Sequence, residues 1–130
     1  MHIRVLLLSL IFLPGLVAAE EPEAAQPALE YLEMTPKFTV NLQERRKYLM
    51  VDIQLLVEGE SQIETVKKHF PALRHEVIML LSGRPMKELQ SAEPREKLRQ
   101  EALGKIRETL VKYADNDTIK DLFFTEFLIQ

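Results

Sequence analysis

Residues 48–58 read Tyr-Leu-Met-Val-Asp-Ile-Gln-Leu-Leu-Val-Glu and give the strongest structural signal in the chain. Every second residue from Leu49 to Val57 is aliphatic, and Asp52 and Gln54 lie between them. Side chains alternate across a β-strand with this spacing of two, and β-branched residues favour extended backbone. We therefore expect a long strand that turns its Leu49–Val57 set toward the core.

A second strand is expected just before it, over residues 31–43, where apolar and polar residues again alternate. Pro36 interrupts this run, because proline has no N–H to donate to a strand ladder. Residues 43–47 are polar or charged and read as a turn. Two strands joined by a short polar turn form an antiparallel hairpin.

Helical signals follow the hairpin. Ser61 and Glu64 match a capping box, which predicts a short helix with Ser61 as its N-cap and an end near His69. Pro71 suits the first turn of a second helix, and Gly83 suits the position just after its end.

The third helix is expected to be the longest. Ser91 is its candidate N-cap, and proline is tolerated in the first turn that follows. An apolar stripe at i, i+4 spacing then runs along one face. Its members are Leu98, Ala102, Ile106 and Leu110.

Residues 119–130 are rich in aromatic and β-branched residues and predict a closing strand. Its two faces are both largely apolar, so we expect an inner position in the sheet, beside the first strand. The order β-β-α-α-α-β predicts an α+β fold, a small antiparallel or mixed sheet with helices packed on one face. Simple alternation places Leu122, Phe124 and Leu128 on one side of the closing strand and Phe123, Phe127 and Ile129 on the other.

Residues 1–19 resemble a targeting segment, with Arg4 ahead of an apolar run and small residues at Val17 and Ala19. We expect cleavage between Ala19 and Glu20. The apolar part is shorter than the roughly 20 residues that span a bilayer, although a short uncleaved anchor is the alternative. Residues 20–29 are an acidic, proline-containing lead, and residues 30–130 form one domain.

Composition excludes several classes of chemistry. The net charge is −3, which gives no bulk electrostatic case for nucleic acid, and the chain has no cysteine. Four scattered glycines build no phosphate-binding loop, and His69 and His75 are too far apart for a helical metal pair. We therefore expect no metal, no cofactor and no enzymatic activity.

The polar turn offers a possible interaction surface. Arg45, Arg46 and Lys47 form a basic cluster, and Tyr48 and Met50 lie on the outward side of the strand that follows. Such a cluster can contact a partner or anionic lipid headgroups at the inner membrane. The alternative is an ordinary solvated hairpin turn.

Five segments, in order, resemble the flagellar basal body-associated FliL family over residues 31–130. Each segment is weak alone, and their combination with the last one at residues 123–130 is specific. They are Phe38-Thr-Val-Asn-Leu42, Tyr48-Leu-Met-Val-Asp-Ile-Gln-Leu-Leu-Val57, Pro71-Ala-Leu-Arg-His-Glu-Val-Ile-Met-Leu-Leu-Ser82, Glu88-Leu-Gln-Ser91 with Lys97-Leu98, and Phe123-Phe-Thr-Glu-Phe-Leu-Ile-Gln130.

The resemblance implies a stomatin-like α+β domain in the periplasm, beside the stator units of the flagellar basal body. Members of the family support swimming or swarming, are thought to assemble into rings, and carry no catalytic residues. A membrane helix usually precedes the family domain, so an uncleaved segment here implies anchoring in the inner membrane. A periplasmic adaptor or lipid-surface-binding domain without a motor role is the alternative function.

Overall fold

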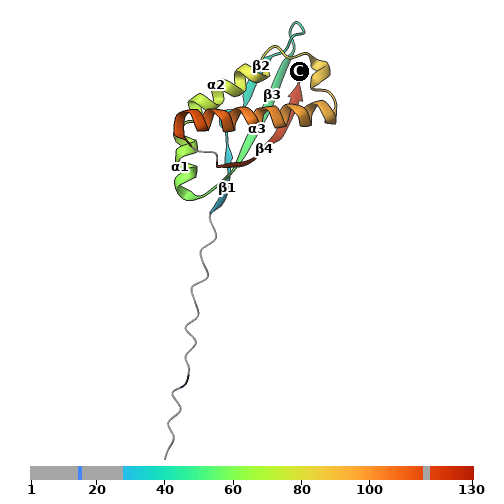
Figure 1. Cartoon of the computed structure of the whole chain (residues 1–130). Helices are drawn as coiled ribbons and strands as arrows, with labels where there is room; N and C mark the ends of the chain where they lie inside the picture. The colour runs from blue at the N-terminus through green and yellow to red at the C-terminus, as the bar shows by residue number, and fades with distance from the viewer. Residues whose placement is uncertain (1–14, 16–27, 116–117) are drawn as a thin grey trace, which may run out of the picture.

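A single antiparallel sheet of four strands organises the molecule, with β3 at its centre (Figure 1). The computed structural model describes residue 15 and residues 28–115 and 118–130. β1 and β2 pair with opposite ends of β3 along one side, and β4 pairs with it along the other. The strands are β1 (Leu29–Glu33), β2 (Phe38–Asn41), β3 (Tyr48–Glu58) and β4 (Ile119–Ile129).

The inward side of β3 forms the centre of the core, as its alternation predicts. Burial of each such aliphatic side chain contributes about 1.5–3 kcal/mol to folding. These side chains have no solvent exposure: Leu49, Val51, Ile53, Leu55 and Val57 are each 0% exposed.

The predicted first strand is split at Pro36, as expected. β1 pairs with β3 between Leu29↔Glu58 and Glu33↔Gln54, and β2 pairs with it from Phe38↔Val51 onward. The backbone between the two strands includes a cis Thr35–Pro36 peptide bond. The antiparallel hairpin of β2 and β3 is confirmed.

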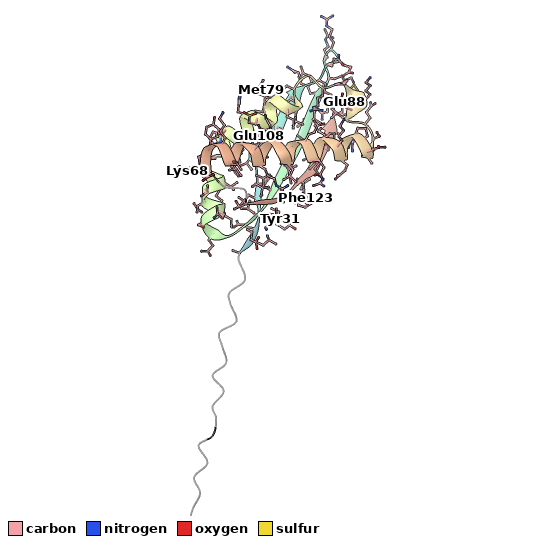
Figure 2. All side chains as sticks on the ribbon, in the orientation of Figure 1. Tyr31, Lys68, Met79, Glu88, Glu108 and Phe123 are labelled. Carbon is pink, nitrogen blue, oxygen red and sulfur yellow. The ribbon has the colours of Figure 1, made fainter. Side chains whose placement is uncertain are left out.

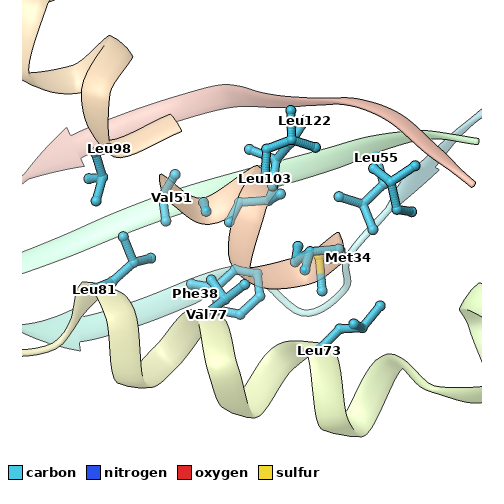
Figure 3. Packing of buried hydrophobic residues seen from close by; sticks show 14 of the residues in the cluster. Met34, Phe38, Val51, Leu55, Leu73, Val77, Leu81, Leu98, Leu103 and Leu122 are labelled. Atoms are coloured by element: carbon cyan, nitrogen blue, oxygen red, sulfur yellow. The ribbon is translucent and has the colours of Figure 1, made fainter. Parts of the chain in front are cut away.

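Among the residues described between β3 and β4, there are three α-helices and one 3₁₀ turn. They are α1 (Glu60–Lys68), α2 (Phe70–Leu81), the 3₁₀ turn η1 (Met86–Glu88) and α3 (Ala92–Ala114). α2 and α3 lie over the inner face of the sheet (Figure 1). Figure 3 shows Leu73, Val77 and Leu81 of α2 turned toward Met34 and Phe38. This two-layer α+β arrangement, with helices on one face, confirms the predicted fold class; the likeness to stomatin stays a prediction.

The helix ends agree with the sequence at two points and differ at one. Gly83, with φ of 75°, follows the end of α2, and Ser91 is the N-cap of α3. The predicted capping box at Ser61 is wrong, because the N-cap of α1 is Gly59, two residues earlier. Gly59 has φ of 96°, which glycine adopts without strain, and its carbonyl accepts hydrogen bonds from the N–H groups of Gln62 and Ile63. No side-chain cap is needed there.

β4 differs from its prediction more strongly. It is an edge strand that pairs with β3, so the expected inner position beside the first strand is wrong. Two register shifts leave Lys120 and Thr125 as extra residues, and each bulge changes the face of the residues beyond it. Leu122, Phe124, Phe127 and Ile129 therefore all turn inward, and the predicted two-sided division of the phenylalanines is also wrong.

No helix in residues 28–115 or 118–130 is both long enough and apolar enough to cross a bilayer.

Candidate interaction surfaces

The β2–β3 hairpin ends in a cationic tip formed by Arg45, Arg46 and Lys47. All three side chains are exposed, and none has an ion-pair partner among the described residues. The acidic neighbour Glu44 is turned away, since its carboxylate accepts the Met86 N–H at 3.1 Å. The tip therefore presents three positive charges to solvent.

The loop after α2 holds this tip in place. Gly83 donates its N–H to the Asn41 carbonyl at 2.7 Å, and Gln43 donates to the Arg84 carbonyl at 3.0 Å. The hairpin thus projects as a braced element at the end of the sheet opposite to β1 (Figure 1). A braced tip loses little conformational entropy when it binds a partner.

No helix in the described part of the chain covers the outer face of the sheet, and an apolar patch lies there beside the tip. Tyr48 and Leu128 are 44% and 42% exposed, and Met50 is half-buried between them on β3. Leu128 reaches this patch because it pairs with Met50 in the register that the Thr125 bulge sets. Apolar side chains beside cations are typical of association surfaces.

A second apolar patch lies at the other end of the outer face. Tyr31 of β1 and Phe123 of β4 meet across β3, with ring centroids 6.1 Å apart (Figure 2). Leu29 and Tyr31 are 59% and 60% exposed, and Leu56 lies directly opposite Tyr31 on β3. Ordinary soluble sheets place polar residues at such positions.

An ion cluster separates the two patches. Lys37 is hydrogen-bonded to Glu126 and lies 3.5 Å from Asp52. The hydrogen bond from Lys37 lowers the pKa of the Glu126 carboxyl, and the same contact raises the pKa of Lys37. One carboxylate oxygen of Asp52, Oδ1, is buried and has no hydrogen-bond partner in the described part of the chain.

A hollow of about 570 Å³ lies between η1 and the start of α3. Its charged lining is internally paired in part, since Arg84 contacts Glu101 at 2.7 Å and Glu88 at 3.3 Å. Across residues 28–115 and 118–130, His and acidic side chains form no group of three able to hold a metal ion. The described polar clusters are thus ion pairs and surface charges.

The predicted interaction residues lie together in the structure. Arg45, Arg46 and Lys47 occupy the tip, and Tyr48 and Met50 continue from it along the outer face of β3. The predicted cleavage pair, Ala19 and Glu20, lies outside the described residues. Sequence reasoning missed Leu128, because only the bulge at Thr125 turns that residue outward, and a bulge leaves no local signal.

Fold and surfaces together define a small α+β domain that presents a cationic tip and an open sheet face to its surroundings. Residues 31–130 match the model of the flagellar basal body-associated protein FliL family. The Flagellar protein FliL of Aquifex aeolicus (strain VF5) is 31% identical over 112 residues, which are 84% of this chain and 67% of that protein. The chain belongs to the FliL family and is a flagellar basal body-associated protein.

Proposed function

We propose that this chain is a non-catalytic accessory protein of the flagellar motor that acts in the periplasm beside the stator and supports swimming or swarming. Membership of the FliL family, over residues 31–130, is the observation that carries the proposal. The exposed tip and the open sheet face agree with a function that depends on association. On this proposal the partners are stator or basal-body proteins and further copies of the same chain.

Deletion of the gene tests the motor role. The expected result is reduced swimming in liquid or reduced swarming on soft agar, restored by the full chain, with flagella still present by electron microscopy. Normal motility in both media would contradict the proposal. Missing flagella would point to an assembly function instead of a motor function.

The cationic tip is the proposed contact with the motor. We expect Arg45→Glu with Arg46→Glu to reduce recruitment of a fluorescently labelled chain to the basal body, because the reversal replaces two unpaired cations by anions. Lys67→Glu with Lys68→Glu, on the last turn of α1, is the matched control for an exposed basic pair. Recruitment that is equal in both double variants would remove the tip from the interface.

The N-terminal segment determines how the domain is held. We propose that residues 1–19 are a cleaved signal peptide, that residues 20–29 are a lead, and that residues 30–130 are the working domain. N-terminal sequencing of the periplasmic form is then expected to begin at Glu20. Recovery of the intact N-terminus in inner membranes would show anchoring by that segment.

A second candidate function is a periplasmic adaptor or lipid-surface-binding domain without a motor role. The observation that favours it is the position of Tyr48 and Met50 beside the cationic tip, since aromatic and basic residues together suit an anionic membrane surface. Co-sedimentation with vesicles of phosphatidylglycerol and phosphatidylethanolamine tests it. Binding that the Arg45→Glu, Arg46→Glu pair abolishes, in a deletion strain of normal motility, would favour this function over the first.

A further inference from the structure

The free edge of β4 is divided into two unlike halves. In the first half, the Arg107 guanidinium donates to the Ile119 carbonyl at 2.9 Å and to the Lys120 carbonyl at 3.2 Å. Arg99 donates to the Leu122 carbonyl at 2.9 Å. Both arginines come from α3, and they occupy the acceptors that another strand would need.

The second half, residues 124–129, has no such cover within the described chain. Tyr48 and Gln130 exchange two backbone hydrogen bonds, each 2.9 Å long. This pair shows which residues of β4 turn their N–H and C=O groups toward β3. In an antiparallel pair, alternate residues turn their N–H and C=O groups away from the partner. Phe127 and Ile129 therefore direct these groups to the open edge, where a further strand can pair.

A hollow of about 250 Å³ lies beside this open half, between β4 and the first turns of α3. Phe124 and Phe127 form its apolar wall. The Arg95 guanidinium stands 4.5 Å from the centre of the Phe127 ring, and its Nε donates to the Leu89 carbonyl at 2.6 Å. A groove with a strand edge on one side and a helix on the other is a common site for extended peptides.

The charged side chains of this groove are unevenly paired. Arg99 contacts both Glu96 and Asp121, each at 2.6 Å. Arg95 has no carboxylate partner among the described residues. The Arg95 guanidinium therefore borders an apolar hollow without an ion pair, and it favours an occupant that brings a carboxylate to it.

We propose that residues 124–129 and this hollow bind an extended acidic segment of a partner protein, which adds to the sheet as a strand beside β4. Alternate side chains of the segment fall on the side of Phe127, so apolar ones fill the hollow and an acidic one meets Arg95.

A second copy of the chain, paired through its own β4, fits this edge less well than the acidic segment. Symmetric pairing around Phe127 brings two Arg95 side chains together, and Glu126 of each copy is on the outer face, held by Lys37.

The test titrates the isotopically labelled full chain with the capped peptide Thr-Val-Thr-Glu-Thr-Val-Thr and follows backbone amide shifts by NMR. We expect saturable shifts concentrated at residues 124–129. A lysine in place of the peptide glutamate is expected to weaken binding by about tenfold or more, the usual size for one charged hydrogen bond. Because directly opposite residues of an antiparallel pair share a face, the N–H groups that pair with β4 belong to the valines and the glutamate, and N-methylation of these three residues is expected to abolish binding.

The Arg95→Glu variant supplies the reciprocal control. It is expected to reverse the preference, so that the lysine peptide binds better than the glutamate peptide. Shifts confined to other surfaces, no shifts at millimolar peptide, or equal binding of the N-methylated peptide would overturn the proposal, and these outcomes need no folded variant. Concentration-dependent shifts at residues 124–129 without peptide would identify a second copy as the occupant and overturn the acidic segment. None of these outcomes depends on the motor role proposed above.

Discussion

The two faces of the sheet use the same strands for opposite purposes. On the inner face, every second residue of β3 from Leu49 to Val57 has a fully buried aliphatic side chain, and α2 and α3 cover this face. On the outer face, no described helix covers the strands, and Tyr31, Tyr48 and Leu128 remain more than two-fifths exposed. Apolar content is therefore a poor measure of burial in this molecule, because both faces carry it.

The difference shows where stability and association are located. The inner face stabilises the folded chain, because its side chains pack against neighbours on all sides. The outer face holds apolar surface that the described chain leaves in water. Substitutions on the two faces should consequently separate folding from recruitment to the basal body.

The largest expected effect is on the inner face at β4. Removal of residues 123–130 takes away six of the nine residue pairs between β3 and β4, and the packing of Phe124, Phe127 and Ile129 against the core. These side chains are partly buried, so each contributes less than the about 1.5–3 kcal/mol of a fully buried one. Together with the lost strand pairing, the losses are still large beside a typical unfolding free energy of about 5–15 kcal/mol. We expect the truncated chain to lose its cooperative thermal transition in circular dichroism.

A chain that lacks only Gln130 is the control for this truncation, and it is expected to melt cooperatively. A cooperative transition in the longer truncation would show that β4 contributes little to the core.

The next effect compares neighbouring leucines of β3. Leu55 is 0% exposed on the inner face, whereas Leu56 is half-buried on the outer face opposite Tyr31. Leu55→Ala is expected to lower the unfolding free energy by about 2–5 kcal/mol, the usual cost of a core cavity. Leu56→Ala is expected to lower it by less than about 1 kcal/mol. Urea denaturation of both variants measures the difference, and equal losses would mean that the outer face is covered in solution.

Sequence alone could predict the hairpin, the fold class and the inner face of β3. The alternation from Leu49 to Val57 reports burial directly, since β3 has cover on one side and the period of two is unbroken. The charged residues of the tip likewise predict a turn. In both cases the signal lies in neighbouring residues of the sequence, and strand pairing does not change which residues are buried or exposed.

The rest depends on contacts between distant segments. The bulges at Lys120 and Thr125 arise in the pairing of β4 with β3, so alternation along β4 assigned Phe127, Ile129 and Leu128 to the wrong sides. Ser61 and Glu64 did match a capping box, but the positive φ of Gly59 ended β3 and began α1 before that motif. The cover of the β4 edge by arginines of α3 has no sequence signal at all.

A smaller effect is expected at the covered half of the β4 edge. Arg99 is 19% exposed and donates to the Leu122 carbonyl and to Asp121. Arg99→Met keeps most of the apolar stem and removes those hydrogen bonds, so we expect a loss of about 1–2 kcal/mol in unfolding free energy. Lys120→Met, which breaks only the exposed pair with Glu58, is the control and should cost less than about 1 kcal/mol. Equal costs would mean that the edge contacts contribute nothing beyond a surface ion pair.

The smallest effect concerns the pH dependence of Glu96, on the exposed side of α3. Hydrogen bonds from Arg99 and then from Gln100 lower its pKa from the ordinary 4.5 to about 2. A carboxyl with a lowered pKa stabilises the folded state above its unfolded pKa, and this contribution disappears as the pH falls from about 4.5 to 2.

Because Glu96 is exposed, solvent and salt screen its pair with Arg99. The change in unfolding free energy should therefore be slight, while the pKa itself is readily measured. Carboxyl ¹³C titration by NMR is expected to give a midpoint near 2 in the unaltered chain and a midpoint raised toward 4.5 in Arg99→Met, where the Gln100 hydrogen bond remains. A midpoint near 4.5 in both chains would show that the Arg99–Glu96 pair does not persist in solution, and that Arg99 serves the β4 edge alone.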